Sequence, residues 1–171
     1  MKTKKMVTAA LLVSLGIVIP TISIPIIPDP AVSATLAAHV PIIVAMFISP
    51  FVAIVTALGT TLGFILKGLP IVVSLRAFSH IIFAIVGSLM LVKINGKPFN
   101  THFIWLRIFI VYIVTLILHT ASELLVIRLI APDTVHMMVG MGIFMLHHTI
   151  DFAISIAIVQ ALKSVRGIDA F

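Results

Sequence analysis

Residues 71–92 read IVVSLRAFSHIIFAIVGSLMLV, and this stretch decides the class of fold. A helix needs about 20 predominantly apolar residues to cross the hydrocarbon core of a bilayer, and this stretch is long enough. Its strongest exceptions are Arg76 and His80. Ionisable side chains are costly inside a membrane and usually face the interior of a helix bundle. The stretch therefore predicts a membrane-spanning helix with a polar face turned inward.

The composition of the whole chain supports the same class. Of its 171 residues, 61% are hydrophobic and 9% are charged, whereas a soluble domain has about 25% charged residues. We therefore expect apolar side chains to face lipid, in one domain that covers residues 1–171. The chain has no Cys, which excludes disulfides, thiolate catalysis and Cys-based metal sites.

Further apolar stretches predict an all-α integral membrane protein, a compact bundle of six transmembrane helices. The basic N-terminus resembles a signal peptide, but no convincing cleavage site follows it, so we expect a retained first helix. Residues 22–30 contain too many prolines for a regular helix. Irregular backbone at membrane depth must be buried in protein or line a cavity, so this segment is a candidate lid. The expected helices cover residues 6–20, 34–48, 50–66, 71–92, 105–130 and 136–162.

The net charge of +6 comes mainly from basic residues in short connections. We interpret these residues as topology signals rather than as a nucleic-acid-binding patch. Basic residues are enriched on the cytoplasmic side of membrane proteins. Both termini and the loop at residues 93–102 are therefore expected in the cytoplasm, and residues 67–70 and 131–133 outside. The basic residues on the expected cytoplasmic side are Lys2, Lys4, Lys5, Lys93, Lys97, Lys163 and Arg166.

Polar side chains on three helices are predicted to meet at one depth. At about 1.5 Å per residue, His80 lies about 14 Å below the outer end of its helix, and His119 and His147 about 16 Å below theirs. On the same scale, Arg76 and Glu123 lie about 8 and 10 Å down. Spacings of four residues put Arg76 beside His80 and His119 beside Glu123. This arrangement predicts an interior polar pocket that opens outward.

Arg76 is the strongest feature of this pocket, because a buried guanidinium needs an anion and matches a carboxylate bidentately. The structural alternative is that Arg76 only pairs with Glu123 as a strut between helices. The histidines could likewise be satisfied core residues. His147 and His148 are neighbours, so their side chains point about 100° apart, since a helix has about 3.6 residues per turn. We therefore expect that they do not both face inward, and that Asp151 orients His147.

Three short strings carry a family resemblance: LAAHVP at residues 36–41, AMFISP at 45–50 and LRAFSH at 75–80. With the six predicted helices, the basic N-terminus and the apolar loop after the first helix, the chain resembles the substrate-binding S components of energy-coupling factor (ECF) vitamin transporters. The resemblance covers essentially the whole length and is strongest to the niacin-specific type. It implies a six-helix fold in the cell membrane and no catalytic residue, cofactor or metal.

The resemblance also implies partners. Transport would need a transmembrane coupling protein and two cytoplasmic ATPases, since this chain has no Walker motif. Family members carry Ala-xxx-Ala on the first helix to contact the coupling protein, and the matching positions here are Ala10 and Ser14. Small residues four apart allow another helix to approach closely. Packing within the same bundle is the alternative for this pair.

A niacin ligand suits the predicted pocket. Nicotinate offers a carboxylate for Arg76 and a ring nitrogen for a histidine donor, while His39 or Lys67 would close the outer side. Pantothenate, biotin or a pyridoxine-like acid would suit a basic anchor as well. The predicted substrate-binding residues are Arg76, His80, His119, Glu123, His147, His39 and Lys67.

Two functions of other classes use the same residues. A b-type haem electron carrier needs facing histidines, such as His80 with His119 or His147. A polar ligand suits the nearby Arg76 and Glu123 better than a porphyrin does. An intramembrane metal site or hydrolase would use a donor set from two helices, but the first of these helices reads HTASE rather than the HExxH pattern of zinc proteases. That donor set would be His119, Glu123, His147 and Asp151.

Overall fold

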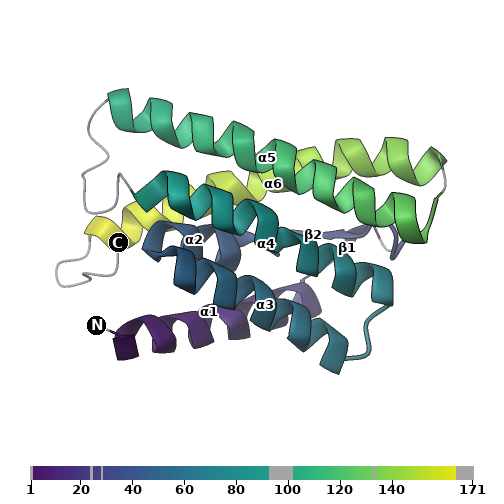
Figure 1. The fold of residues 1–171 in the computed structure, drawn as a ribbon, viewed down its shortest axis with the longest axis horizontal. Helices are drawn as coiled ribbons and strands as arrows, with labels where there is room; N and C mark the ends of the chain where they lie inside the picture. The colour runs from purple at the N-terminus through teal and green to yellow at the C-terminus, as the bar shows by residue number, and fades with distance from the viewer. Residues whose placement is uncertain (1, 24, 28, 93–101, 133, 165–171) are drawn as a thin grey trace.

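The structure is a computed structural model that describes all residues except 1, 24, 28, 93–101, 133 and 165–171. The described residues form six helices and a two-stranded antiparallel hairpin (Figure 1). The elements are α1 (Lys2–Ile22), β1 (Pro25–Ile27), β2 (Ala34–Thr35), α2 (Val40–Ile48), α3 (Pro50–Leu66), α4 (Ile71–Leu91), α5 (His102–Ile130) and α6 (Thr134–Ser164).

The all-α membrane bundle predicted from the sequence is confirmed. By length and composition, α1, α4, α5 and α6 are each able to cross a membrane. The shorter α3 is also apolar. The start of α1 and the end of α6 lie at the same end of the bundle, and the α3–α4 and α5–α6 connections lie at the other end (Figure 1). The predicted loop at residues 93–102 lies outside the described residues, except that His102 begins α5.

The second helix differs from its prediction. We expected it to begin near residue 34, but α2 begins at Val40 and has nine residues, all of them buried. Ala34 and Thr35 instead pair with β1, and Ala37 has a φ of 65°, a left-handed conformation that a helix cannot contain. As a result, α2 is too short to span a bilayer and forms part of the core. His39 stands at its N-cap instead of one turn inside it.

The Pro-rich segment also differs in part. The first helix was expected to end at Pro20, but α1 continues to Ile22 with Pro20 inside it. The following hairpin and the chain at residues 29–35 run beside the bundle, in the half that contains the α3–α4 and α5–α6 connections (Figure 1). An Asp29 carboxylate oxygen accepts the backbone N–H of Ala31 at 2.8 Å, which shapes this turn. The segment thus lies where the predicted lid would lie.

Helix α1 packs closely on α3. A Cβ at Gly16 would collide with Thr60, and one at Gly59 would collide with Val13, so both glycines permit a close approach. Ala9 on α1 is also buried. Ala10 and Ser14 are exposed on another side of α1, so the predicted small-residue pair is not used within the described bundle.

Candidate functional site

A cavity of about 270 Å³ lies between the segment at residues 30–35 and the helices. Ligand pockets commonly have volumes of about 300–1,000 Å³, so this cavity suits only a small molecule. Phe64 and Pro70 line its apolar side. Five of the seven predicted substrate-binding residues also line it: Arg76, His80, Glu123, His147 and His39.

Arg76 connects the segment above the cavity to the bundle. Its Nη2 donates to the Ser33 carbonyl at 2.8 Å and lies 3.1 Å from Glu123 Oε2. Its Nη1 makes longer contacts of 3.2 to 3.3 Å with Ser33 Oγ and with the carbonyls of Pro30 and Ala31. Within the described part of the chain, Nε has no hydrogen-bond partner. The guanidinium therefore has one ion pair, one short hydrogen bond to the Ser33 carbonyl and a group of longer contacts through Nη1.

The Phe144 ring completes the surroundings of Arg76. The guanidinium carbon lies 4.5 Å from the centre of this ring, a cation–π contact. Neither Ser33 nor Phe144 was selected from the sequence, because a serine in a loop and a phenylalanine in an apolar helix carry no distinguishing pattern. Their contacts with Arg76 depend on how the loop and α6 fold around it.

Glu123 on α5 contacts side chains of α4 and of its own helix. Its Oε2 pairs with Arg76, and its Oε1 lies 2.8 Å from His80 Nε2. His119 Nε2 lies 3.6 Å from the same Oε1. Glu123 is 1% exposed and His119 is fully buried, so the carboxylate lies inside the bundle. His119 is not among the cavity-lining residues.

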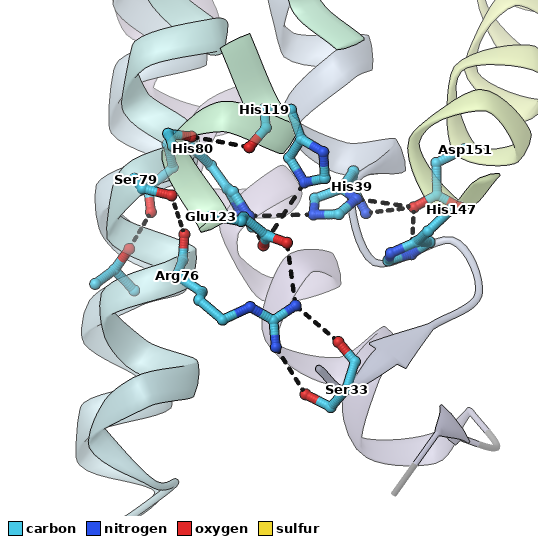
Figure 2. Close-up of polar contacts among 12 residues, drawn as sticks. Ser33, His39, Arg76, Ser79, His80, His119, Glu123, His147 and Asp151 are labelled. Carbon is cyan, nitrogen blue, oxygen red and sulfur yellow. Dashed lines mark hydrogen bonds and ion pairs between the residues drawn. The ribbon is translucent and has the colours of Figure 1, made fainter. Parts of the chain in front are cut away.

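His39 occupies the centre of the histidine cluster (Figure 2). Its ring centre lies 4.5 Å from those of His80, His119 and His147. Its Nε2 faces His80 Nε2 at 3.3 Å, and its Nδ1 lies 3.3 Å from Asp151 Oδ2. The short α2 and its N-cap position bring His39 here, which the sequence analysis did not anticipate.

Asp151 organises the other side of the cluster. Its two oxygens accept the backbone N–H groups of Ala37 and His39 at 2.8 and 2.9 Å, and Oδ2 lies 3.0 Å from His147 Nε2. The predicted partnership with His147 is present in the structure. Asp151 also holds the chain at the start of α2, where Ala37 has its left-handed conformation.

Two further expectations concern the His147–His148 pair and Lys67. His147 and His148 were not expected to face inward together; both are buried, but of the two only His147 lines the cavity. His148 turns to Thr115 Oγ1 at 3.1 Å, away from the cavity-lining side. Lys67 is exposed and is not among the cavity-lining residues; its Nζ donates to Thr21 near the end of α1.

An ion pair beyond the predicted set holds the segment above the cavity to α6. Asp29 Oδ2 lies 3.1 Å from His136 Nε2, with both side chains partly exposed. The sequence analysis selected neither residue for the site, because Asp29 lies in the Pro-rich loop and His136 at a helix end. Their meeting depends on the path of the hairpin.

The geometry disfavours a haem. Ligation by two histidines requires their imidazoles to face each other across a porphyrin. Here the His39 ring lies within 4.5 Å, centre to centre, of the ring of each proposed ligand, and His80 already contacts Glu123 at 2.8 Å. The packed rings leave no slot for a porphyrin between them.

Comparison with known proteins supports the predicted resemblance. A stretch of 94 residues, 54% of this chain, is 45% identical to the niacin transporter NiaX of Lactococcus lactis subsp. cremoris (strain MG1363). The match covers 41% of that relative's length. No family model and no solved structure matches the chain. A transporter relative and a bundle of apolar helices agree with the prediction of a transport protein rather than an enzyme. Over about half its length, the chain is thus similar to a niacin transporter.

Proposed function

We propose that this chain is the substrate-binding membrane subunit of an ECF-type importer, and that it captures a small carboxylate vitamin from outside the cell. Niacin is the leading candidate, because the relative is named a niacin transporter and the cavity suits a molecule of that size. The observation that carries the proposal is a buried, incompletely satisfied guanidinium, that of Arg76, at the wall of a small cavity.

Arg76 is the proposed reader of the ligand carboxylate. A planar guanidinium binds a carboxylate through two parallel hydrogen bonds. The long contacts from Nη1 to the loop at residues 30–33 are the ones that a carboxylate would replace. The pair with Glu123 would remain and hold the guanidinium in position.

The rest of the cavity suits an aromatic ring. Phe64 and Pro70 offer apolar surface, and His80 and His147 offer polar ring nitrogens. A pyridine nitrogen needs one hydrogen-bond donor, and a neutral imidazole has one N–H to donate. In this arrangement nicotinate lies with its carboxylate at Arg76 and its nitrogen toward the histidines.

The proposed topology follows from the basic residues. Lys4 and Lys5 lie near the start of α1 and Lys163 near the end of α6, at the same end of the bundle (Figure 1). The positive-inside rule assigns that end to the cytoplasm. The segment above the cavity lies in the opposite half, so the cavity would open outward. Uptake would then require the coupling protein and two ATPases of an ECF module.

Equilibrium binding tests the proposal. The purified chain, alone in detergent, is titrated with labelled nicotinate, with nicotinamide, pantothenate and pyridoxine as competitors. Binding displaced by nicotinate but not by nicotinamide supports a site that recognises the carboxylate. Displacement only by pantothenate or pyridoxine keeps the class of protein and changes the vitamin. No binding of any of these compounds would contradict the proposal.

A further inference from the structure

Four buried side chains bring donor atoms close together beside the cavity: His39, His80, His119 and Glu123. One donor atom from each lies within 4.8 Å of all the others, and all four residues are buried. They come from α4, α5 and the N-cap of α2, so no single sequence motif contains them (Figure 2). We propose that they bind one zinc-type divalent metal ion.

Three of the six separations between the donor atoms are close to those of tetrahedral coordination, and all six are within 4.8 Å. With metal–ligand bonds of about 2.0–2.1 Å, neighbouring ligand atoms in a tetrahedral site lie about 3.3 Å apart. The observed separations are 3.3 Å for His39 Nε2 to His80 Nε2, 2.8 Å for His80 Nε2 to Glu123 Oε1, and 3.6 Å for His119 Nε2 to Glu123 Oε1.

Hydrogen bonds alone do not satisfy this group of atoms. A ring nitrogen carries either a proton or a lone pair. If His80 Nε2 is protonated, one proton faces both Glu123 Oε1 and His39 Nε2; if it is not, its lone pair faces a carboxylate oxygen. Among the described residues, neither ring nitrogen of His119 has a hydrogen-bond partner. A cation shared by the four atoms removes the conflict at His80 Nε2 and gives His119 Nε2 a partner.

The surroundings also favour a metal. Metal-binding histidines usually direct their second nitrogen to a carboxylate or carbonyl, and His39 Nδ1 lies 3.3 Å from Asp151 Oδ2. The contact meets the distance of an ion pair but not the geometry of a hydrogen bond; it places a carboxylate beside Nδ1, while Nε2 faces the other donor atoms. Asp151 already accepts two backbone N–H groups, so it suits this supporting position better than a ligand position.

Charge gives a functional reason for the ion. With neutral histidines, the buried charges of the described helices are Arg76, Glu123 and Asp151, which together carry a charge of −1. An anionic ligand would be repelled by that net charge in a low-dielectric interior. A divalent cation changes the net charge to +1 and attracts the anion. Magnesium and calcium prefer oxygen ligands, so three nitrogens and one oxygen favour zinc or a neighbouring transition metal.

The test is metal binding by the full chain, purified in detergent without a histidine tag. After loading with zinc and desalting, we expect about one zinc ion per chain, the occupancy of a single four-ligand site. His119→Leu should lose it, whereas His148→Leu, which changes a buried histidine outside the donor set, should keep it. Asp151→Asn should weaken zinc binding about 10- to 100-fold, as changes in supporting partners of metal ligands do.

Two results would overturn the inference: no zinc retained by the unchanged protein, or equal retention by His119→Leu. If His119→Leu does not fold, the visible absorption spectrum of cobalt bound to the unchanged protein provides the test. Strong visible bands of tetrahedral Co²⁺ in the unchanged protein support the site, and weak octahedral bands or no bound cobalt contradict it. Because zinc is measured without nicotinate, this result is independent of the proposed vitamin. Nicotinate binding with and without chelator then reports whether the ion assists the ligand.

Discussion

Arg76 on α4 and Glu123 on α5 form an ion pair of 3.1 Å with both side chains buried. Removing one partner of a buried pair leaves an uncompensated charge and costs about 3–5 kcal/mol, whereas replacing both by apolar residues is often neutral. We therefore predict that Glu123→Leu lowers the midpoint of thermal unfolding in detergent strongly, and that Arg76→Met/Glu123→Leu recovers most of the loss.

The double variant, compared with Glu123→Leu alone, also separates the two interpretations of Arg76, because both variants lack Glu123. If Arg76 binds the ligand carboxylate, the double variant binds nicotinate much more weakly than Glu123→Leu does. If Arg76 is only a strut, the two variants bind nicotinate equally, and the proposed role is contradicted. Both properties are measured on the same purified sample.

A second substitution at Arg76 tests the geometry of its contact with the ligand separately from its charge. Arg76→Lys keeps the positive charge but loses the planar fork. Losing one charge-assisted hydrogen bond, worth about 1.5–3 kcal/mol, weakens binding about 10- to 150-fold. We expect nicotinate affinity to fall in this range. The matched control is Arg128→Lys, at an exposed position near the end of α5, where affinity should not change. An unchanged affinity in Arg76→Lys would argue against a bidentate contact.

Hydrophobic pattern and polar exceptions were enough to predict the bundle and the histidine and charged side chains that line the cavity. The helix ends of α4 and α5 lie close to the predicted ones, because apolar length fixes them. Arg76, His80 and Glu123 were found for a general reason: ionisable residues inside apolar helices rarely face lipid. Their depths also agreed, since the rise per residue of a helix is constant.

The remaining features depend on tertiary structure. The position of His39 follows from a hairpin and from a left-handed Ala37, whose backbone N–H is held by an aspartate 114 residues away. No local pattern in the sequence encodes that pairing. Lys67 was expected at the cavity because it lies in the connection before α4, but its side chain turns to Thr21 instead. In both cases, the path of the loop backbone determined where the side chain lies, and the position of the residue in the sequence did not reveal it.

The contact between Asp29 and His136 provides a test of the segment above the cavity. The two atoms lie 3.1 Å apart, but the side chains are 44% and 31% exposed, so the pair is worth about 0–1 kcal/mol. We predict that Asp29→Asn speeds release of bound nicotinate by up to about fivefold, because 1.4 kcal/mol corresponds to tenfold. Dissociation after dilution measures the rate.

The salt dependence of nicotinate release distinguishes loss of the ion pair from a general loosening of the segment above the cavity. An exposed ion pair is screened at high ionic strength. The difference between Asp29→Asn and the unchanged protein should therefore shrink when dissociation is measured in high salt. A difference that persists in high salt would contradict a role for the ion pair, because asparagine keeps an oxygen that can accept the backbone N–H of Ala31.

The exposed small residues of α1 give a prediction about transport rather than binding. Ala10 and Ser14 are exposed on α1, whereas Gly16 is buried against α3. If a coupling protein packs on the exposed side, Ala10→Leu and Ser14→Leu should block its close approach. We expect vitamin uptake by cells that contain the coupling module to fall severely. Nicotinate binding to the purified chain should stay the same, since neither residue lines the cavity.

Gly16→Leu is the contrasting variant on the same helix. Its side chain would collide with Thr60, so this change should lower thermal stability and reduce the yield of folded protein. Val18→Leu, at an exposed position of α1, should affect neither stability nor uptake and serves as the control for added bulk. Normal uptake in Ser14→Leu would mean that the partner does not use this face. Loss of binding together with loss of uptake would mean that the substitution disturbs the bundle itself, because a defect confined to coupling leaves the isolated subunit intact.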